Sequence, residues 1–457
     1  MVQKRFLSLR KALWSAGTVA AVVLAALAGT PGTAGSAQAA ALASSARPCD
    51  IYAAGGTPCV AAYSTVRALY RTYRGPLYQV TRASDGKTAD IGVLETGGYA
   101  DAAAQNSFCA GTVCTITRIY DQSPDHNDLG VGPIGGNGGP DAAAIANALP
   151  VTIGGHQVYG VSVQAGVGYR NDVTRGVPVG SQPQGAYMVT SGTHVDALCC
   201  FDFGNAETSG TDNGNGHMDA INFGTECWFT PCTGSGPWDQ ADMENGLFAG
   251  GNGSDPGNRG NSSTFVTAML KNNGTTTYAI KDANAQSGSL TTEYNGPLPD
   301  IGGYTPMHQE GAVILGTGGD NSNESDGSFF EGVITAGYPS DVADAAVQAN
   351  IVAVGYQPVA AGFPATGSPY TITNVNSGQV LDSVNCGTAD GTLTDLWSSL
   401  HNLCQEWNVT PAGSHYTISN VANGMVLDAE DCETANGTTV RQWAQLDNTC
   451  QQWDIKP

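Results

Sequence analysis

Carboxylates at two places in the chain have neighbours that suit them for catalysis. Residues 241–245 (ADMEN) alternate polar and apolar types, which predicts a strand with Asp242 and Glu244 on one face, about 7 Å apart. Asp320 follows two glycines that permit close backbone approach, directly after the apolar run 312–315. We expect this run to be a strand that delivers Asp320 to a cleft. Two carboxyl groups flanking a glycosidic bond are what glycoside hydrolysis requires, whereas a solvated strand face is the simpler interpretation of Asp242 and Glu244.

Several other chemistries find no support in the sequence. There is no Gly-x-Ser-x-Gly nucleophile elbow and no His-Glu-x-x-His zinc motif in the chain. The acidic stretch 320–327 lacks the glycine at its sixth position that an EF-hand loop requires. Residues 316–319 are rich in glycine, but an exported β-rich chain has little use for a nucleotide cradle. No nucleophile other than a carboxylate stands out, and we expect neither a metal nor an organic cofactor.

The N-terminus has the features of a secretory signal peptide. Four basic residues lie within the first 11, residues 12–29 are mostly Ala, Val and Leu, and Ala37-Gln38-Ala39 supplies small residues for cleavage. Residues 1–39 are therefore expected to be removed, and the mature protein to be secreted, extracellular and not membrane-bound. Losing the basic leader makes the net charge of −22 more negative. Such an acidic chain repels phosphate backbones, so nucleic acid is not an expected partner.

The 12 cysteines of an exported chain are expected to form disulfides. Pairing the other cysteines by proximity in the sequence leaves Cys199 and Cys200, which are neighbours. They bond either to each other or each to a more distant cysteine. A bond between neighbours would present a flat, apolar sulfur surface, which suits the face of a sugar ring. The full set predicted by proximity is Cys49–Cys59, Cys109–Cys114, Cys199–Cys200, Cys227–Cys232, Cys386–Cys404 and Cys432–Cys450.

The elements expected to hold these residues are mostly short strands. Glycine accounts for 61 of 457 residues and only 13% are charged, a composition typical of strands joined by many turns. Segments such as 187–190 and 265–270 predict strands of an all-β sandwich, jelly-roll-like, over 40–358. Two helices are expected: one over 62–73, where apolar residues share one face, and one over 340–352, with Ser340 as N-cap.

The C-terminal part, 369–457, is an internal duplication preceded by a linker at 359–368. The segment 370–375 recurs at 416–421, and every matched pair is offset by 46 residues. Each unit contains a Gln-x-Trp motif, and the units resemble the ricin B-type lectin repeats, which build a β-trefoil. A trefoil needs three units and two are found, so a degenerate third unit and an incomplete trefoil both stay open.

The lectin resemblance assigns one sugar contact to each repeat. In that family an Asp and an aromatic residue 15 positions later hold a sugar, and this spacing is met by Asp382 with Trp397 and by Asp428 with Trp443. A core position is the alternative for these tryptophans. For the tryptophans of the two Gln-x-Trp motifs, Trp407 and Trp453, we expect a core position.

The larger domain resembles family 54 of the glycoside hydrolases, the α-L-arabinofuranosidases of the B type. The likeness is collinear from about 48 to 357. It is carried by Pro48-Cys49-Asp50-Ile51-Tyr52, Tyr120-Asp121-Gln122-Ser123, Cys199-Cys200-Phe201-Asp202, Gly204-Asn205-Ala206-Glu207-Thr208, Asp242-Met243-Glu244-Asn245 and Gly318-Gly319-Asp320-Asn321-Ser322-Asn323.

This resemblance implies a β-sandwich and a retaining mechanism. It makes Glu244 the nucleophile, kept ionised by donors such as Asn245, and Asp320 the general acid/base. The arabinofuranose pocket is then lined by Asp242, Asn245, Leu247, Gly319 and Trp228, with the Cys199–Cys200 disulfide as its platform. The loop around Trp228 departs from the family pattern because a cysteine pair encloses it.

The sequence thus predicts a monomeric, exo-acting α-L-arabinofuranosidase that acts on plant cell-wall arabinan or arabinoxylan, with a module that binds polysaccharide. Two alternatives stay open. One is a glycosidase of the same fold with another specificity, such as xylose or galactofuranose. The other is a secreted lectin without catalytic activity, against which the presence of Glu244 and Asp320 argues.

Overall fold

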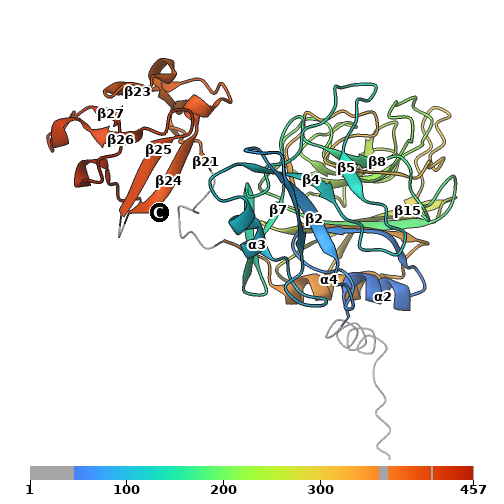
Figure 1. The fold of residues 1–457 in the computed structure, drawn as a ribbon. Coiled ribbons are helices and arrows are strands. Elements are labelled where there is room, and N and C mark those ends of the chain that lie inside the picture. Colours follow the sequence, from blue (N-terminus) through green and yellow to red (C-terminus); the bar gives the residue numbers. More distant parts are fainter. Residues whose placement is uncertain (1–45, 360–368, 413–414, 456–457) are drawn as a thin grey trace, which may run out of the picture.

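The architecture is that of two β-rich bodies (Figure 1). A computed structural model describes residues 46–359, 369–412 and 415–455. The predicted signal peptide, 1–39, lies outside these residues, as does the predicted linker except for residue 359. Within the described part of the chain, no helix combines the length and the apolar character needed to cross a bilayer.

Two antiparallel sheets pack face to face in the larger body, as the sequence predicts. The six-stranded sheet is ordered β1 (Cys59–Ser64), β19 (Glu331–Ala336), β9 (Gln184–Thr190), β14 (Val266–Asn272), β15 (Thr277–Asn284) and β16 (Thr291–Pro297). The ten-stranded sheet is ordered β13 (Leu247–Phe248), β12 (Trp238–Asp242), β11 (Asp219–Gly224), β10 (Asp202–Ala206), β17 (Ala312–Leu315), β8 (Tyr169–Asn171), β5 (Leu129–Val131), β4 (Cys114–Ile119), β2 (Pro76–Arg82) and β3 (Thr88–Gly92).

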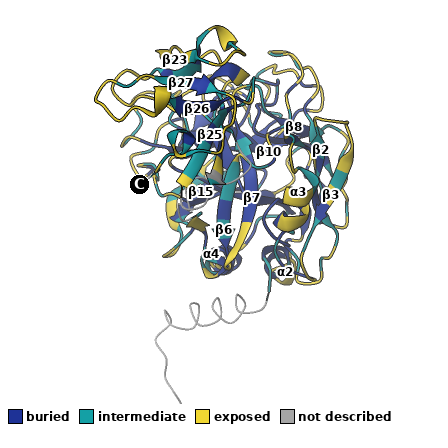
Figure 2. Cartoon of the chain, turned by 60° about the vertical axis from the view of Figure 1, so that its left-hand side comes forward, coloured by how far each residue is buried: buried dark blue, intermediate teal, exposed yellow. Residues whose placement is uncertain are grey.

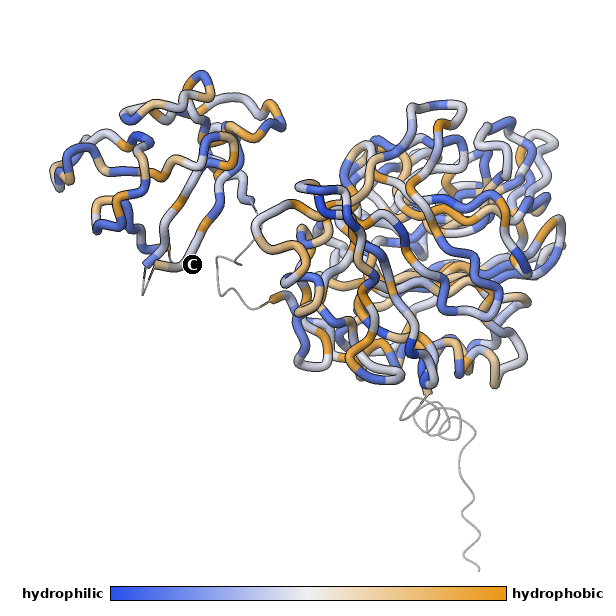
Figure 3. Tube along the Cα trace, viewed as in Figure 1, coloured by the Kyte–Doolittle hydropathy of each residue, from blue (hydrophilic) through white to orange (hydrophobic). Residues whose placement is uncertain are grey.

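The core lies between these sheets. The ring of Phe203 in β10 meets Tyr63 of β1 edge-on, with centroids 6.2 Å apart, and approaches Phe329 at 5.3 Å. The strands of the sandwich are mostly buried, and exposed residues gather in loops (Figure 2). Figure 3 shows hydrophobic residues running along the same strands. Burial of both faces explains why β9, β10, β11 and β14 are buried along their whole length.

Smaller elements cover the edges of the sandwich. A third sheet is ordered β18 (Gly327–Phe329), β7 (His156–Val163), β6 (Leu149–Ile153) and β20 (Gln357–Pro358). The helices of this body are α2 (Pro48–Ala54), α3 (Ala102–Phe108) and α4 (Asp341–Val354), and α2 packs against α4. The predicted helix at 340–352 is confirmed as α4, whose N-cap Ser340 accepts a hydrogen bond from the Ala343 amide at 3.2 Å.

The predicted helix at 62–73 is wrong. Its first residues belong to β1, which pairs with β19, and the Ala62 amide donates to Asp121 Oδ1 at 2.7 Å. After the strand, Ser64 Oγ accepts from the amides of Val66 and Arg67, which turns the chain away. Pairing with a distant strand therefore overrides a local periodicity that suits a helix.

The smaller body contains one seven-stranded sheet. It is ordered β21 (Pro369–Tyr370), β24 (Trp407–Ala412), β25 (His415–Asn420), β26 (Val426–Ala429), β27 (Val440–Trp443), β23 (Thr392–Trp397) and β22 (Val380–Ser383). Short 3₁₀ turns follow: η1 (Val384–Cys386), η2 (Leu403–Gln405), η3 (Glu430–Cys432) and η4 (Thr449–Gln451). The hairpin β22–β23 corresponds to β26–β27, and Trp407 is fully buried in the small core, against which Trp453 packs. The sheet is β-trefoil-like and built from two repeats.

A buried ion pair ties the start of the larger body to the sandwich. Arg67 Nη2 donates to Glu331 Oε1 at 2.6 Å, and both side chains are at most 1% exposed. The same carboxylate accepts from the hydroxyls of Tyr187 and Tyr356, and Arg67 Nη1 donates to Asn350. Each guanidinium nitrogen and each carboxylate oxygen of the pair thus has a hydrogen-bond partner, and such bonding is the condition under which a buried ion pair is tolerated.

We predict that Arg67→Met lowers the free energy of unfolding by about 3–5 kcal/mol, because it leaves the Glu331 carboxylate buried without its cation. Urea unfolding followed by tryptophan fluorescence measures the change. Arg71→Met, at an exposed arginine four residues away, serves as the control and should change stability by less than about 0.5 kcal/mol. Equal behaviour of the two variants would contradict this role of the ion pair.

Candidate active site

A cavity of about 530 Å³ opens among the loops that join the strands of the ten-stranded sheet. Seven of the nine residues predicted for the site line it: Cys199, Cys200, Trp228, Asp242, Glu244, Gly319 and Asp320. The other two do not. Leu247 is 1% exposed within β13, where it pairs with Asp242, and Asn245 is exposed at the turn. Gly246 lines the cavity in their place.

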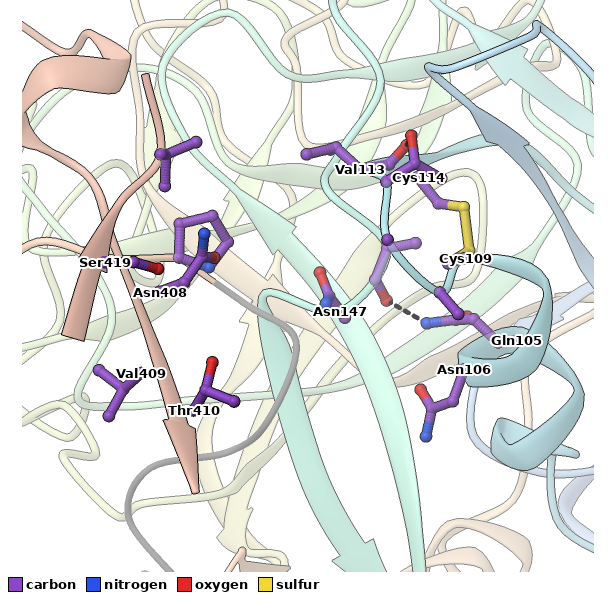
Figure 4. Close-up of a pocket in the computed structure, with 16 residues that line it drawn as sticks. Gln105, Asn106, Cys109, Val113, Cys114, Asn147, Asn408, Val409, Thr410 and Ser419 are labelled. Atoms are coloured by element: carbon purple, nitrogen blue, oxygen red, sulfur yellow. Dashed lines mark hydrogen bonds between the residues drawn. A yellow bond between two sulfur atoms is a disulfide. The ribbon is translucent and has the colours of Figure 1, made fainter. Parts of the chain in front are cut away.

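A larger cavity, of about 660 Å³, lies elsewhere and lacks the groups for catalysis. It is bounded by α3 and the loop closed by Cys109–Cys114 on one side, and by β24 and β25 on the other (Figure 4). Its lining consists of amides, hydroxyls and apolar groups, among them Gln105, whose Nε2 donates to the Ala146 carbonyl at 2.9 Å. Because no carboxylate, imidazole or amine lines it, we assign acid/base chemistry to the smaller cavity.

Glu244 enters the cavity from a turn rather than from a strand. The predicted strand over 241–245 ends early, because β12 stops at Asp242 and Glu244 has a φ of 74°. This left-handed conformation is uncommon outside glycine and marks a constrained position. The turn is fixed by two hydrogen bonds: the Glu244 amide donates to Asp242 Oδ1 at 2.8 Å, and the Tyr304 hydroxyl donates to the Met243 carbonyl.

The Glu244 carboxylate is buried and accepts three backbone hydrogen bonds. Oε1 accepts from the amides of Asn213 at 2.8 Å and Gly214 at 3.1 Å, and Oε2 accepts from the His217 amide at 2.7 Å. The side chain itself is 0% exposed. Amide donors of this kind fix the orientation of the carboxylate. The expectation that Asn245 is such a donor is wrong, since the loop between β10 and β11 supplies them.

Asp320 lies in a loop that follows β17 and is braced from outside the sheet. Its Oδ1 accepts from the Ser322 amide at 3.0 Å, and its carbonyl accepts from the Asn137 amide at 3.0 Å. Asn321, with a φ of 69°, donates through Nδ2 to the Gly139 carbonyl at 2.6 Å. The apolar run 312–315 thus forms the predicted strand, and residues 137–139 hold the loop that presents Asp320.

The neighbouring cysteines form one wall of the cavity. All six disulfides of the described residues join the pairs that proximity predicts, including Cys199–Cys200. Ser322 Oγ lies 3.5 Å from Cys200 Sγ, and the Glu324 amide donates to the Cys199 carbonyl at 3.1 Å. The disulfide is therefore fixed to the loop that presents Asp320. At the rim, Trp228 is 53% exposed.

Asp202 forms a buried acid pair with Asp242. One sulfur of Cys200 and one oxygen of each carboxylate lie within 4.8 Å of one another, but the sulfur is committed to a disulfide and offers no thiolate to a metal. Burial raises the pKa of Asp242 to about 7, and burial and Asp242 together raise that of Asp202 well above its usual range. The two carboxyls consequently share a proton, while Asp202 Oδ1 accepts from Asn222 at 2.8 Å.

Glu207 is a second buried acid, directly behind the loop of Asp320. It is 0% exposed, and neither carboxylate oxygen has a hydrogen-bond partner. Burial raises its pKa to about 8, and the charges of Glu244 and Asp242 act in the same direction. A Cβ on Gly319 would lie 2.1 Å from Glu207 Oε2. Only glycine therefore fits at 319 beside the Glu207 side chain.

Arg170 of β8 connects the two loops that meet behind the cavity. Its guanidinium donates to the carbonyls of Gly319 and Glu207 and to the carboxylate of Asp172, and the residue is 5% exposed. It thus binds the backbone of the Asp320 loop without reaching the cavity, where it would neutralise the acids.

Several residues of the site could not be predicted from the sequence, because their amino-acid type does not indicate their role. Asn213, Gly214 and His217 act through backbone amides, which carry no side-chain signature, although the run of Asn and Gly at 213–216 suits a loop that turns its amides inward. Glu207 belongs to a motif of the family resemblance, but nothing in its spacing indicates burial. Arg170 gives no local signal at all.

The catalytic-domain model described as "Alpha-L-arabinofuranosidase B, catalytic" matches residues 48–357, and a model described as "Ricin-type beta-trefoil lectin domain-like" matches 360–443 and 413–457. A probable α-L-arabinofuranosidase B of Aspergillus fumigatus is 56% identical over 317 residues, 68% of this chain and 62% of the relative. An α-L-arabinofuranosidase B of Aspergillus oryzae is 53% identical over 318 residues, 68% of this chain and 63% of the relative. The chain therefore matches less than two thirds of the length of these relatives.

Solved structures show the same likeness over most of the chain. A GH54 α-L-arabinofuranosidase soaked with a cyclic sulfate inhibitor is 41% identical, with a TM-score of 0.68, and the match covers 89% of this chain and 87% of that one. An arabinofuranosidase complexed with arabinofuranosyl-α-1,2-xylobiose is 40% identical, with a TM-score of 0.69 and coverage of 89% and 87%.

We predict that Glu207→Gln changes how stability depends on pH. The pKa of Glu207 is about 8 in the folded protein against an ordinary value of 4.5, so between these values the folded state binds more protons than the unfolded state. Stability from this group then falls as pH rises from about 5 to 8. Because glutamine does not titrate, the melting temperature of the variant relative to the wild type should rise over this interval, as measured by calorimetry.

The exposed Glu95→Gln provides the matched control, and its difference from the wild type should stay constant with pH. A constant difference for Glu207→Gln as well would show that Glu207 is already ionised in the folded protein near pH 5.

Proposed function

The chain belongs to the α-L-arabinofuranosidase B catalytic family, and on that premise we propose that it is a retaining, exo-acting α-L-arabinofuranosidase. It removes terminal arabinofuranose from arabinan or arabinoxylan. The observation that carries the proposal is that Glu244 and Asp320 line the same cavity, together with the Cys199–Cys200 disulfide. An arabinofuranosyl-xylobiose bound to a related arabinofuranosidase supports the choice of substrate.

Glu244 acts as the nucleophile. Its carboxylate attacks the anomeric carbon while the bond from that carbon to the leaving oxygen breaks, which gives an arabinosyl ester of Glu244. The three backbone amides that bind the carboxylate fix its orientation. Since they come from the backbone, they add no positive charge that would oppose the charge developing on the sugar.

Asp320 acts as the general acid and then as the general base. It transfers its proton to the leaving oxygen as the first bond breaks. It then takes a proton from water, whose oxygen attacks the anomeric carbon and releases Glu244. Two inversions at the same carbon return the α configuration, and the two carboxyls are expected about 5–5.5 Å apart, as in other retaining enzymes.

The charge of the cavity favours a neutral sugar. No lysine or arginine lines it. Six residues of the lining carry a carboxyl group: Asp212, Glu226, Asp242, Glu244, Asp320 and Glu324. Such a surface repels uronic acids and phosphorylated sugars and stabilises an oxocarbenium-like transition state, which carries positive charge. Asp242, held by its proton-sharing partner Asp202, is suited to accept hydrogen bonds from sugar hydroxyls.

The apolar parts of the cavity are suited to the ring itself. The disulfide of Cys199 and Cys200 provides a surface against which the sugar ring packs, and Gly319 allows it to approach the backbone closely. Trp228, exposed at the rim, is placed to contact the remainder of the polysaccharide.

The smaller body, which resembles a lectin, keeps the enzyme on its substrate. We assign polysaccharide binding to this body and propose that the protein acts outside the cell, where six disulfides are stable. A polysaccharide held by the second body raises the local concentration of side chains near the cavity.

We predict that Glu244→Gln lowers kcat by about 10³-fold or more on 4-nitrophenyl arabinofuranoside and on an arabinoxylan oligosaccharide alike, because both need the nucleophile. Asp320→Asn should lose about 10²–10⁴-fold on the oligosaccharide. On the nitrophenyl substrate it should release a rapid burst of nitrophenolate, whose departure needs no proton, before a slow steady state. Stopped-flow absorbance separates the phases.

The exposed Asp300→Asn is the control for the loss of one carboxylate and should retain wild-type rates. Activity of Glu244→Gln near that of the wild type would reject the nucleophile, and hydrolysis of nitrophenyl xyloside but not arabinofuranoside would reject the substrate.

The stereochemistry gives an independent prediction. Proton NMR during the first minutes of hydrolysis should show α-arabinofuranose as the initial product, before mutarotation. Initial release of the β anomer would require direct attack by water and would exclude a covalent intermediate on Glu244.

A further inference from the structure

The two lectin repeats present different groups at equivalent positions. In the hairpin β22–β23, Asp382 lies opposite Asp395, and in the hairpin β26–β27, Asp428 lies opposite Arg441. Residues opposite each other in an antiparallel pair share one face of the sheet. Since the repeats are offset by 46 residues, Asp395 and Arg441 occupy the same position, with opposite charge.

Arg441 covers the face of the second hairpin that carries Asp428 and Trp443. Its Nε donates to Asp428 Oδ1 at 3.2 Å, and its guanidinium carbon lies 4.3 Å from the centre of the Trp443 ring. It also pairs with Glu430 and Asp431 at 3.0 and 3.1 Å. One side chain of the protein thus occupies both contacts, the carboxylate and the ring face, that a bound sugar would need.

Trp443 is further covered by the first repeat. A Cβ on Gly391 would lie 3.8 Å from its Cζ3, and the Ala444 amide donates to Asp390 Oδ1 at 2.7 Å. The indole is accordingly half-buried, whereas the equivalent Trp397 is 54% exposed.

The first hairpin is open and rich in hydrogen-bond acceptors. Asp395 is exposed beside Trp397, and across the ladder Asp382 is partly buried. Partial burial raises the pKa of Asp382, and the charge of Asp395 raises it further. Two like charges directly opposite each other destabilise a hairpin. Hydroxyl groups of a ligand would relieve this repulsion by donating to both carboxylates, while the ligand's ring covers the indole.

We propose that the first hairpin alone is a carbohydrate-binding site, for a neutral sugar with neighbouring hydroxyl groups, and that Arg441 keeps the second hairpin closed. The inference rests on the proposed function for its choice of glycan. The smaller body would then bind one sugar, although its sequence contains two repeats with the same Asp/Trp spacing.

The test measures binding of the full chain to insoluble arabinoxylan by depletion, in the Glu244→Gln background so that the polysaccharide is not cut. Trp397→Ala should weaken binding about tenfold, the loss of one stacked ring, and Asp382→Asn should weaken it too. Trp443→Ala, the matched variant in the other repeat, should bind as the parent does. Arg441→Gln, which uncovers Asp428 and Trp443, should raise the affinity and the amount of polysaccharide bound.

Several results would overturn the proposal. These are equal losses for Trp397→Ala and Trp443→Ala, unchanged binding for Arg441→Gln, or full binding by Asp382→Asn, which would indicate adsorption on an apolar ring rather than a built site. Each lectin variant with Glu244 intact should hydrolyse 4-nitrophenyl arabinofuranoside at the wild-type rate, which reports correct folding of the larger body. Absence of that activity in the wild type would reject the proposed function and leave the comparison of the two hairpins valid.

Discussion

The structure of the cavity is governed by one electrostatic constraint, which is that several carboxyl groups lie close together with little positive charge among them. Glu244, Asp242, Asp202 and Glu207 are each at most 7% exposed. Four ionised carboxylates cannot coexist at such burial. The chain meets the constraint by distributing protons: Glu207 is neutral below about pH 8, the pair Asp202–Asp242 shares one proton, and Glu244 alone has three backbone donors.

Arg170 supports this arrangement without neutralising the acids of the cavity. The guanidinium of Arg170 binds the carbonyls of Gly319 and Glu207, so it fixes the positions of two loops while the carboxyl of Glu207 keeps no partner. A cation inside the cavity would stabilise Glu244 more strongly. It would also oppose the positive charge that forms on the sugar in the transition state. Backbone amides orient Glu244, the proposed nucleophile, and leave the cavity acidic.

The sequence predicts the strands and disulfides well and the details of the site less well. The alternating and apolar runs identify β9, β14 and β17, and the position of Ser340 identifies the start of α4, because these signals are local. The predicted helix at 62–73 is wrong because β1 pairs with β19, a strand about 270 residues further along the chain. Glu244 was expected on a strand, yet a left-handed turn presents it, and this turn depends on Tyr304, a residue far along the chain, as well as on Asp242. The roles of Glu207 and Arg170 could not be predicted either, because they depend on residues that only the fold brings next to them.

Duplication followed by divergence explains how the second body can hold one open hairpin and one closed one. Both hairpins keep the Asp and Trp spacing and the disulfide of their repeat, because these features also build the hairpin itself. The position opposite the Asp differs between the repeats: Asp395 is exposed, whereas the Arg441 side chain is only 13% exposed. Arg441 satisfies three acids, so it stabilises its own repeat where a ligand would otherwise be needed. In the proposed function a single open site suffices for tethering. The catalytic cavity on the same chain would supply the second contact with the polysaccharide, and two modest contacts on one chain give a combined affinity well above either alone.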